Sequence, residues 1–104
     1  MVGISSVTVK QRLDAGENLF LLDVRGPGEF STMRIGQNET LIPLGKLRTS
    51  TGKLPKDKKR EIITYCKISL RGYEAACYLK SLGYKNVKVM EGGLAAWPYP
   101  LKSD

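Results

Sequence analysis

The sequence predicts an α/β fold built on a mostly parallel β-sheet. Short apolar segments alternate with helical segments along the chain, and the segment 19–24 (LFLLDV) is apolar on both faces. A strand that is apolar on both faces is typical of a sheet covered by helices on both sides. Alternating strands and helices favour parallel pairing, because each crossover returns the chain to the same end of the sheet.

In the first third of the chain, one helix is expected before this strand in the sequence and another after it. Ser5 or Ser6 can cap a helix that runs to about residue 15, where Gly16 ends it. After the strand at 19–24, Pro27 suits the first turn of a short helix that ends near residue 33.

The rest of the chain continues the alternation. It is expected to contain strands at 40–42, 61–65 and 86–90, short helices at 44–49 and 94–97, a basic loop at 51–60 and a longer helix at 72–82. Ligands of parallel α/β sheets bind outside the carboxyl ends of the strands. Asp23, Val24 and Arg25 lie at one such end and Cys66 lies at another, so we expect the functional site there.

Length and composition point to one globular domain covering residues 1–104. The chain is 41% hydrophobic and 26% charged, which is ordinary for a globular protein. It has no apolar run of the ~20 residues that a membrane helix needs. Its first residues, MVGISSVTVK, do not resemble a signal peptide. A cytoplasmic location without a membrane partner is therefore expected.

The formal net charge of +7 raises the question of nucleic-acid binding. Seven of the basic residues lie between Lys46 and Arg60, in a segment with Gly52 and Pro55 and without aromatic residues. Interleaved stacking aromatics are missing from it. We therefore interpret the segment as a solvated loop, which can steer small anions, and predict no nucleic-acid partner.

The chain has two cysteines, Cys66 and Cys77, and no histidine. Two cysteines cannot complete a tetrahedral zinc site, so no metal is predicted. Catalysis by Cys–His or Ser–His–Asp groups is excluded as well. If Cys66 is a nucleophile, groups other than histidine must stabilise its thiolate.

The segment after Cys66 offers such groups. Cys66 follows an apolar strand and precedes a helix, so the loop between them is expected to turn backbone N–H groups toward a centre. The helix N-terminus adds partial positive charge, and Lys67 and Arg71 add full charges. This environment favours the thiolate over the thiol and would bind an anionic donor. The alternative is that Cys66 is a small buried apolar residue.

Several motifs, in order along residues 4–97, resemble the rhodanese family. They are LLDVR at 21–25 with Glu29 and Phe30, IPL at 42–44, ITYC at 63–66 with Arg71, LGYKNV at 82–87 and EGGLAAW at 91–97. The resemblance implies a central five-stranded parallel sheet with helices on both faces, including a short strand near Gly3 and Ile4. It also implies sulfurtransferase chemistry of the thiosulfate:cyanide type, without metal or organic cofactor.

In this family the cysteine takes sulfane sulfur from a donor and passes it to an acceptor. The resemblance thus assigns Cys66 as the nucleophile and names thiosulfate, a polysulfide or a small persulfide as donor and cyanide or a thiol as acceptor. The substrate-binding loop would be Lys67, Ile68, Ser69, Leu70, Arg71 and Gly72. Cys66 to Arg71 is six residues, the length in sulfur-transferring members, whereas phosphatase-like relatives have one more. The apolar Ile68 and Leu70 favour an organic thiol acceptor over cyanide.

The ending LRGY of this loop resembles rhodanese domains fused to flavin-dependent disulfide reductases of the coenzyme A disulfide reductase type. The resemblance therefore implies such a reductase, or a protein sulfur acceptor, as partner. Two other functions stay open: a non-catalytic sulfur-relay or docking module, and a phosphatase-like enzyme, which the short loop disfavours.

Other residues near the site have two interpretations each. Asp23, Arg25 and Glu29 are expected to brace the strand end, with Arg25 paired to Glu29, rather than to contact substrate. Arg71 either points toward a donor or braces the loop. Cys77 is expected on the far face of its helix, away from Cys66 and without a disulfide, although a resolving role is an alternative. The indole of Trp97 is expected to fill the core.

Overall fold

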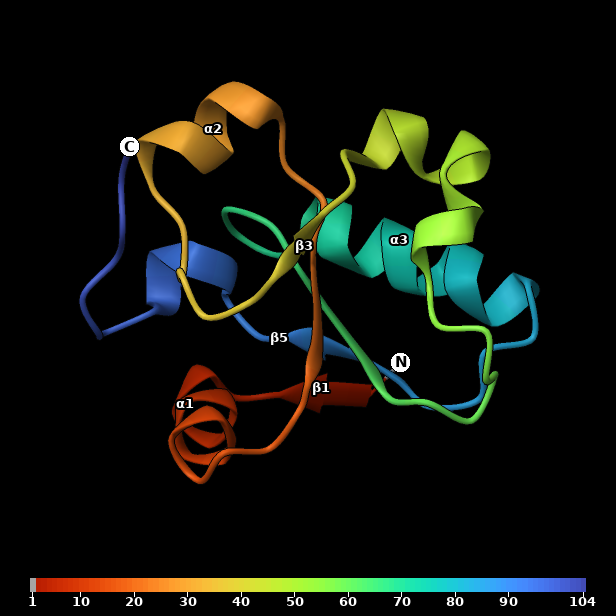
Figure 1. The fold of residues 1–104 in the computed structure, drawn as a ribbon, viewed down its shortest axis with the longest axis horizontal. Helices are drawn as coiled ribbons and strands as arrows, with labels where there is room; N and C mark the ends of the chain where they lie inside the picture. Colours follow the sequence, from red (N-terminus) through yellow and green to blue (C-terminus); the bar gives the residue numbers. More distant parts are fainter. Residues whose placement is uncertain (1) are drawn as a thin grey trace.

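The computed structural model describes residues 2–104, and its centre is a parallel sheet (Figure 1). The strand order is β1-β5-β4-β2-β3, and every pairing is parallel. The strands are β1 (Val2–Ile4), β2 (Phe20–Asp23), β3 (Thr40–Leu41), β4 (Ile62–Tyr65) and β5 (Val87–Met90). The five-stranded sheet, including its N-terminal strand, confirms the predicted fold class.

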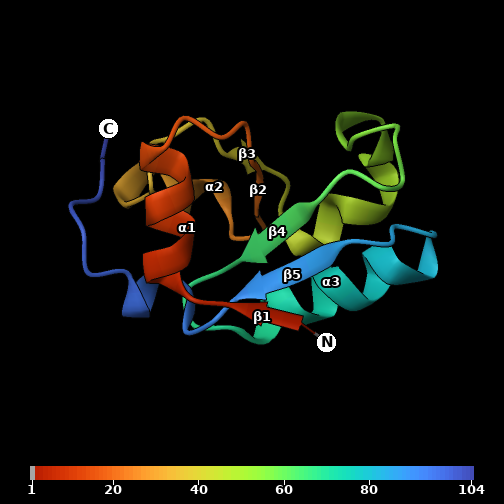
Figure 2. The same cartoon turned by 90° about the horizontal axis from the view of Figure 1, so that it is seen from below.

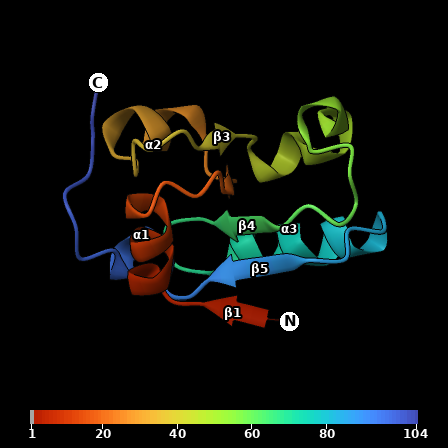
Figure 3. The ribbon, with the colours of Figure 1, turned by 60° about the horizontal axis from the view of Figure 1, so that its bottom comes forward.

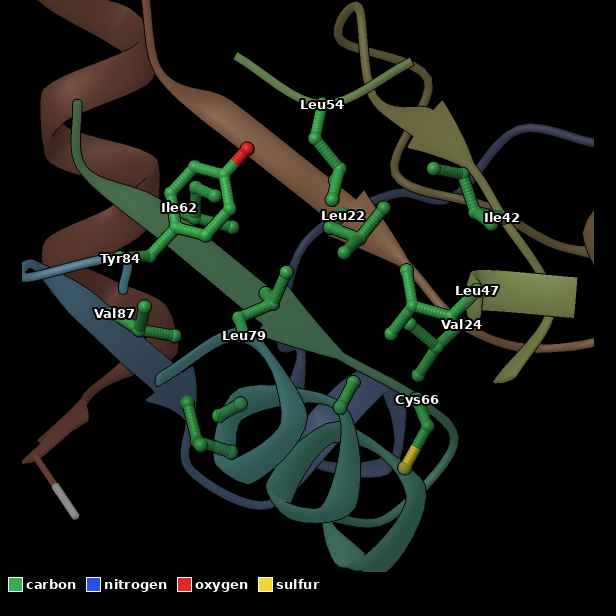
Figure 4. Close-up of a cluster of buried hydrophobic side chains, with 13 residues drawn as sticks. Leu22, Val24, Ile42, Leu47, Leu54, Ile62, Cys66, Leu79, Tyr84 and Val87 are labelled. Atoms are coloured by element: carbon green, nitrogen blue, oxygen red, sulfur yellow. The ribbon is translucent and has the colours of Figure 1, made fainter. Parts of the chain in front are cut away.

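Helices cover both faces of the sheet (Figure 3). The α-helices are α1 (Ser6–Asp14), α2 (Pro27–Thr32) and α3 (Leu70–Ser81), and the 3₁₀ helices are η1 (Leu44–Thr49), η2 (Thr51–Lys53) and η3 (Gly93–Ala96). Side chains from α3 and η1 pack on one face of the sheet, in the cluster drawn in Figure 4. Side chains from α1 and η3 pack on the other face.

The two apolar faces of the strands explain this layering. Successive residues of a strand point to opposite faces, so Leu22 and Ile62 enter the cluster under α3 while Leu21 and Ile63 enter the cluster under α1. All four residues of β4 are buried. β4 is the central strand, and β2 lies next to it, between β4 and β3.

Local signals set the helix ends as expected in the first third of the chain. The Thr8 N–H donates to the Ser5 hydroxyl at 3.1 Å, which caps α1, and Gly16 follows the helix with φ +83°. Pro27 occupies the first turn of α2. The segment expected to be a short helix at 44–49 is helical but of the 3₁₀ type.

The start of α3 differs from the prediction. The helix was expected from residue 72 but begins at Leu70, with a first bond from the Tyr73 N–H to the Ser69 carbonyl at 2.8 Å. Gly72 explains how the helix can begin so close to the sheet: a Cβ there would lie 3.2 Å from the Tyr65 Cα, so only a glycine packs here without a shift. Arg71 and Gly72 are therefore in the first helical turn rather than in a loop.

The basic segment of residues 51–60 lies mainly outside regular structure, with η2 as a single turn. Within residues 2–104, none of the seven basic side chains between Lys46 and Arg60 forms a salt bridge. Arg48 and Lys58 instead lie over the rings of Tyr78 and Tyr84. Across the described residues, no helix has the length and apolar character needed to span a membrane.

Candidate active site

Cys66 lies directly after β4, at the carboxyl end of the central strand. Its side chain is 2% exposed and belongs to the apolar cluster between the sheet and α3. Figure 4 shows its sulfur beside the first turn of that helix. Asp23 of β2 is in register with Tyr65 of β4. The strand register thus brings the ends of β2 and β4 together, as predicted from their position in the sequence.

The chain after Cys66 leaves a run of backbone N–H groups free. None of the six N–H groups from residue 67 to residue 72 donates a hydrogen bond to an acceptor within residues 2–104. Backbone amides seldom stay without an acceptor unless a ligand or water supplies one. Successive free N–H groups at a helix N-terminus form a site for an anion. The segment therefore has the donors that an anionic sulfur species requires.

Residues of η3 donate hydrogen bonds to two carbonyl groups at the start of this segment. Leu94 N–H donates to the Cys66 carbonyl at 2.9 Å, and Ala95 N–H donates to the Lys67 carbonyl at 2.8 Å. With its carbonyls engaged there, the segment keeps its N–H groups available for a ligand. This role of η3 was not predicted, because the sequence indicated only a short helix after a pair of glycines.

Gly93 makes this contact between η3 and the loop possible. Its φ is +58°, and a Cβ at this position would lie 2.3 Å from the Ile68 carbonyl oxygen and 2.5 Å from the Cys66 carbonyl oxygen. Both atoms belong to the backbone and cannot rotate away. The glycine pair at 92–93 was the sequence signal that could have indicated this close approach.

Arg71 forms a bidentate ion pair with Glu29 of α2. Its two terminal nitrogens donate to the Glu29 carboxylate at 2.7 and 2.9 Å, and the Gly26 N–H donates to the same carboxylate at 3.1 Å. These contacts hold the pKa of Glu29 at about 2 and raise that of Arg71. This pair fits the interpretation of Arg71 as a brace for the loop, while Cys66 also contributes to the raised pKa of Arg71, so the guanidinium lies close to the cysteine as well.

The predicted ion pair between Arg25 and Glu29 was wrong. The Arg25 guanidinium instead pairs with Asp23, with Nη2 2.7 Å from the carboxylate, and both side chains are buried. Arg25 contacts Glu29 only at its backbone carbonyl, at 3.3 Å, and donates to the Met33 carbonyl at 2.7 Å. The buried pair thus ties the end of β2 to the middle and the C-terminal end of α2, which fits a bracing role.

The other predicted loop residues differ in exposure. Lys67 is exposed and forms no salt bridge within residues 2–104, so its charge is the uncompensated one at the loop. Ile68 and Leu70 are 63% and 70% exposed. Ser69 occupies the N-cap position of α3, although its hydroxyl makes no capping bond.

Two further predictions are confirmed. Cys77 is exposed on α3 and both cysteines are free, so no disulfide joins it to Cys66. Trp97 is buried in the cluster under α1, with its ring edge-on to Tyr99 at 5.3 Å between centroids, as expected for a core residue.

A cavity of about 460 Å³ lies beside the loop, between α2 and η3. Its lining combines the charged side chains of Arg25, Glu29 and Lys67 with the apolar side chains of Met33 and Leu94. The size is that of cavities that bind small organic molecules. The cavity lies where a donor could approach the loop from the α2 side.

The ion pair of Glu29 predicts a pH-dependent contribution to stability. Because the pKa of Glu29 lies at about 2 in the fold, below its ordinary 4.5, its contribution is present above pH 4.5 and is lost as pH falls toward 2. Both partners are more than a third exposed, so we expect no more than about 1 kcal/mol. Urea unfolding of wild type and Glu29→Gln should differ at pH 6, and this difference should shrink below pH 4.5 to well under half its size at pH 2.5.

Glu74→Gln is the matched control, because this exposed carboxylate of α3 forms no salt bridge within residues 2–104. The free energy of unfolding of Glu74→Gln should stay close to that of wild type at both pH values. A Glu29→Gln difference that is equally large at pH 6 and pH 2.5 would contradict the ion-pair interpretation.

Comparisons with known proteins agree with this geometry. The model of the rhodanese-like domain family matches residues 5–98. A sulfurtransferase of Allochromatium vinosum is 33% identical over 94 residues, which cover 90% of this chain and 85% of the relative. The putative sulfurtransferase YtwF of Bacillus subtilis is 35% identical over 94 residues, which cover 90% of this chain and 87% of the relative.

Among solved structures, that of reduced Bacillus anthracis CoADR-RHD superposes with a TM-score of 0.81 at 29% identity. It covers 93% of this chain, but this chain spans only 16% of that protein. The relatives named sulfurtransferase support an enzyme of the sulfurtransferase kind. With a family model that matches nearly all of its residues, the chain belongs to the rhodanese-like domain family.

Proposed function

We propose that the protein moves sulfane sulfur from a small donor to a thiol or cyanide through a persulfide on Cys66. The observation that carries this proposal is the position of Cys66, which is buried and directly precedes six residues whose backbone N–H groups have no acceptor within residues 2–104. An anionic sulfur bound there would gain hydrogen bonds that the fold itself leaves unused. No organic cofactor or metal is required.

In the first step, the Cys66 thiolate attacks the outer sulfur of thiosulfate. A new S–S bond forms to Cys66, the bond between sulfur and the sulfonate sulfur breaks with its electron pair, and sulfite leaves. The loop N–H groups, the N-terminus of α3 and Lys67 would stabilise the negative charge. The charge of Arg71 contributes less than the sequence suggested, because Glu29 compensates it.

In the second step, a nucleophile takes the outer sulfur from Cys66. Cyanide would form thiocyanate and a thiol would form a new persulfide, and in both cases the electron pair of the S–S bond returns to Cys66. Polysulfides and small persulfides are alternative donors in the same chemistry. We place it in the cytoplasm, where thiols stay reduced and both cysteines can remain free.

We further propose a protein sulfur acceptor or a flavin-dependent disulfide reductase as a physiological partner. The similarity to the CoADR-RHD structure supports this proposal, since that chain is about six times as long as the matching part. The six-residue interval from Cys66 to Arg71 favours sulfur over the larger tetrahedral phosphate as cargo.

Intact-mass measurement after incubation with thiosulfate tests the persulfide. We expect an addition of about 32 Da that maps to Cys66 and disappears when cyanide is added. The protein would gain no mass if Cys66 were only a structural residue. Loading that cyanide or thiols fail to remove would instead favour the sulfur-relay module, which discharges only to a specific protein.

A further inference from the structure

The exposed large apolar side chains of this protein gather around the Cys66 loop. Within residues 2–104 there are six: Val2, Val7, Met33, Ile68, Leu70 and Tyr73. Ile68 and Leu70 belong to the segment after Cys66, and Tyr73 follows in α3. Met33 lines the cavity on one side of this segment, and Val2 lines a groove on its other side. Only Val7, on α1, belongs to neither the loop nor these hollows. Exposed apolar side chains concentrated at one place mark a binding surface.

A groove of about 490 Å³ runs between the edge strand β1 and the start of α3. Figure 2 shows β1 at the edge of the sheet, next to β5. Val2, Leu70 and Tyr73 supply the apolar part of its lining. Gly3 lines the groove with its backbone. A Cβ at Gly3 would lie 2.9 Å from the Glu91 side chain, so this side chain lies against β1.

The groove adjoins the segment that follows Cys66. Ser69 and Leu70 line the groove and also belong to the segment that carries the free N–H groups. Because Cys66 is buried, a molecule that reaches its sulfur must leave the rest of its body outside the loop. The groove is far larger than cyanide and lies within the size range of sites for organic ligands.

Resting on the persulfide chemistry proposed above, we propose that this groove binds the organic body of a neutral, apolar thiol, which is the sulfur acceptor. The Cys66 persulfide is protonated on its outer sulfur, and the thiolate of the acceptor attacks that sulfur. The new S–S bond forms as the old one breaks, and the electron pair returns to Cys66, so that the acceptor leaves as a persulfide and nothing is oxidised or reduced overall.

The charge of the groove favours a neutral acceptor over an anionic one. The Glu91 carboxylate lines the groove and forms no salt bridge within residues 2–104. An acceptor with a carboxylate in its body would meet this like charge. The specificity of the second step is therefore assigned to Leu70 and Tyr73 for apolarity and to Glu91 for charge.

The test uses the protein loaded with sulfur from thiosulfate and measures the rate of its discharge. The quantity compared is the ratio of the second-order rate constant with 1-butanethiol to that with cyanide, because this ratio cancels differences in loading. We expect it to fall about tenfold in Leu70→Ser and in Tyr73→Ser, since a lost apolar contact in a hydrophobic site weakens discrimination by about this factor. The ratio should stay within about twofold of wild type in Val7→Ser, the exposed apolar residue outside the groove.

A second comparison uses 3-mercaptopropionate against 1-butanethiol. Glu91→Gln should raise the relative rate with the anionic thiol about threefold, as expected for removing one exposed like charge. Ratios that stay at the wild-type value in both Leu70→Ser and Tyr73→Ser, or that fall equally in Val7→Ser, would overturn the groove assignment while leaving sulfur transfer intact. A wild-type protein that neither loads with sulfur nor yields thiocyanate would refute the proposed function itself.

Discussion

Cys66→Ser is expected to lose sulfur transfer from thiosulfate to cyanide by a factor of at least about 1,000, as for the removal of other catalytic nucleophiles. The serine side chain has nearly the same shape as the cysteine side chain, which lies buried beside α3, so the replacement fits the same space and the fold should persist. A serine hydroxyl cannot form a persulfide, and no histidine is present to activate it. Thiocyanate formation and circular dichroism together measure the two effects.

Cys77→Ser provides the matched control, because Cys77 is also free but exposed on α3. Its turnover should remain within about twofold of wild type, as for a surface substitution away from the site. A Cys66→Ser protein that still turns over at the wild-type rate would refute the persulfide mechanism. A large loss in Cys77→Ser would instead indicate the resolving role that the sequence left open.

Gly93→Ala is expected to damage both stability and activity although Gly93 lies 27 residues after Cys66. The new Cβ would lie 2.3 and 2.5 Å from two backbone oxygens of the loop, so η3 and the loop must separate. Left-handed backbone strain and overpacking together suggest a loss of about 3 kcal/mol in the free energy of unfolding. Displacement of the loop N–H groups should lower the loading rate by about 100-fold.

Gly16→Ala isolates the effect of the contact from the effect of the backbone conformation. Gly16 also has a positive φ, +83°, but a Cβ there meets no atom within 4 Å. It should cost about 1 kcal/mol from strain alone and leave the loading rate unchanged. Equal effects of the two substitutions on loading would show that η3 does not position the loop.

The sequence was sufficient to predict those features that depend on short-range patterns. The apolar runs located the strands, Ser5, Gly16 and Pro27 located helix ends, and the strand before Cys66 placed this residue at the edge where ligands bind. These signals act within a few residues, so one chain suffices to recognise them. The five strands and their parallel pairing followed from the same alternation together with the family resemblance.

The partners of charged side chains could not be derived in this way. Glu29 is four residues from Arg25 and 42 from Arg71, so proximity in sequence favoured the wrong partner. Arg25 turns back to Asp23 because that carboxylate is fully buried at the end of β2 and needs a cation. Arg71 then meets Glu29 because the start of α3, two residues earlier than predicted, brings the first helical turn opposite α2.

The order of the strands also determines when the site can form. β1 pairs with β5, and the loop after Cys66 contacts Leu94 and Ala95, so both depend on residues that a ribosome adds after Cys66. A ribosome adds about 5–20 residues per second, so a second or more passes between the synthesis of Cys66 and that of η3. Until then the nascent chain carries the thiol without the contacts that position it. The contacts that position Cys66 therefore form only after η3 has been synthesised.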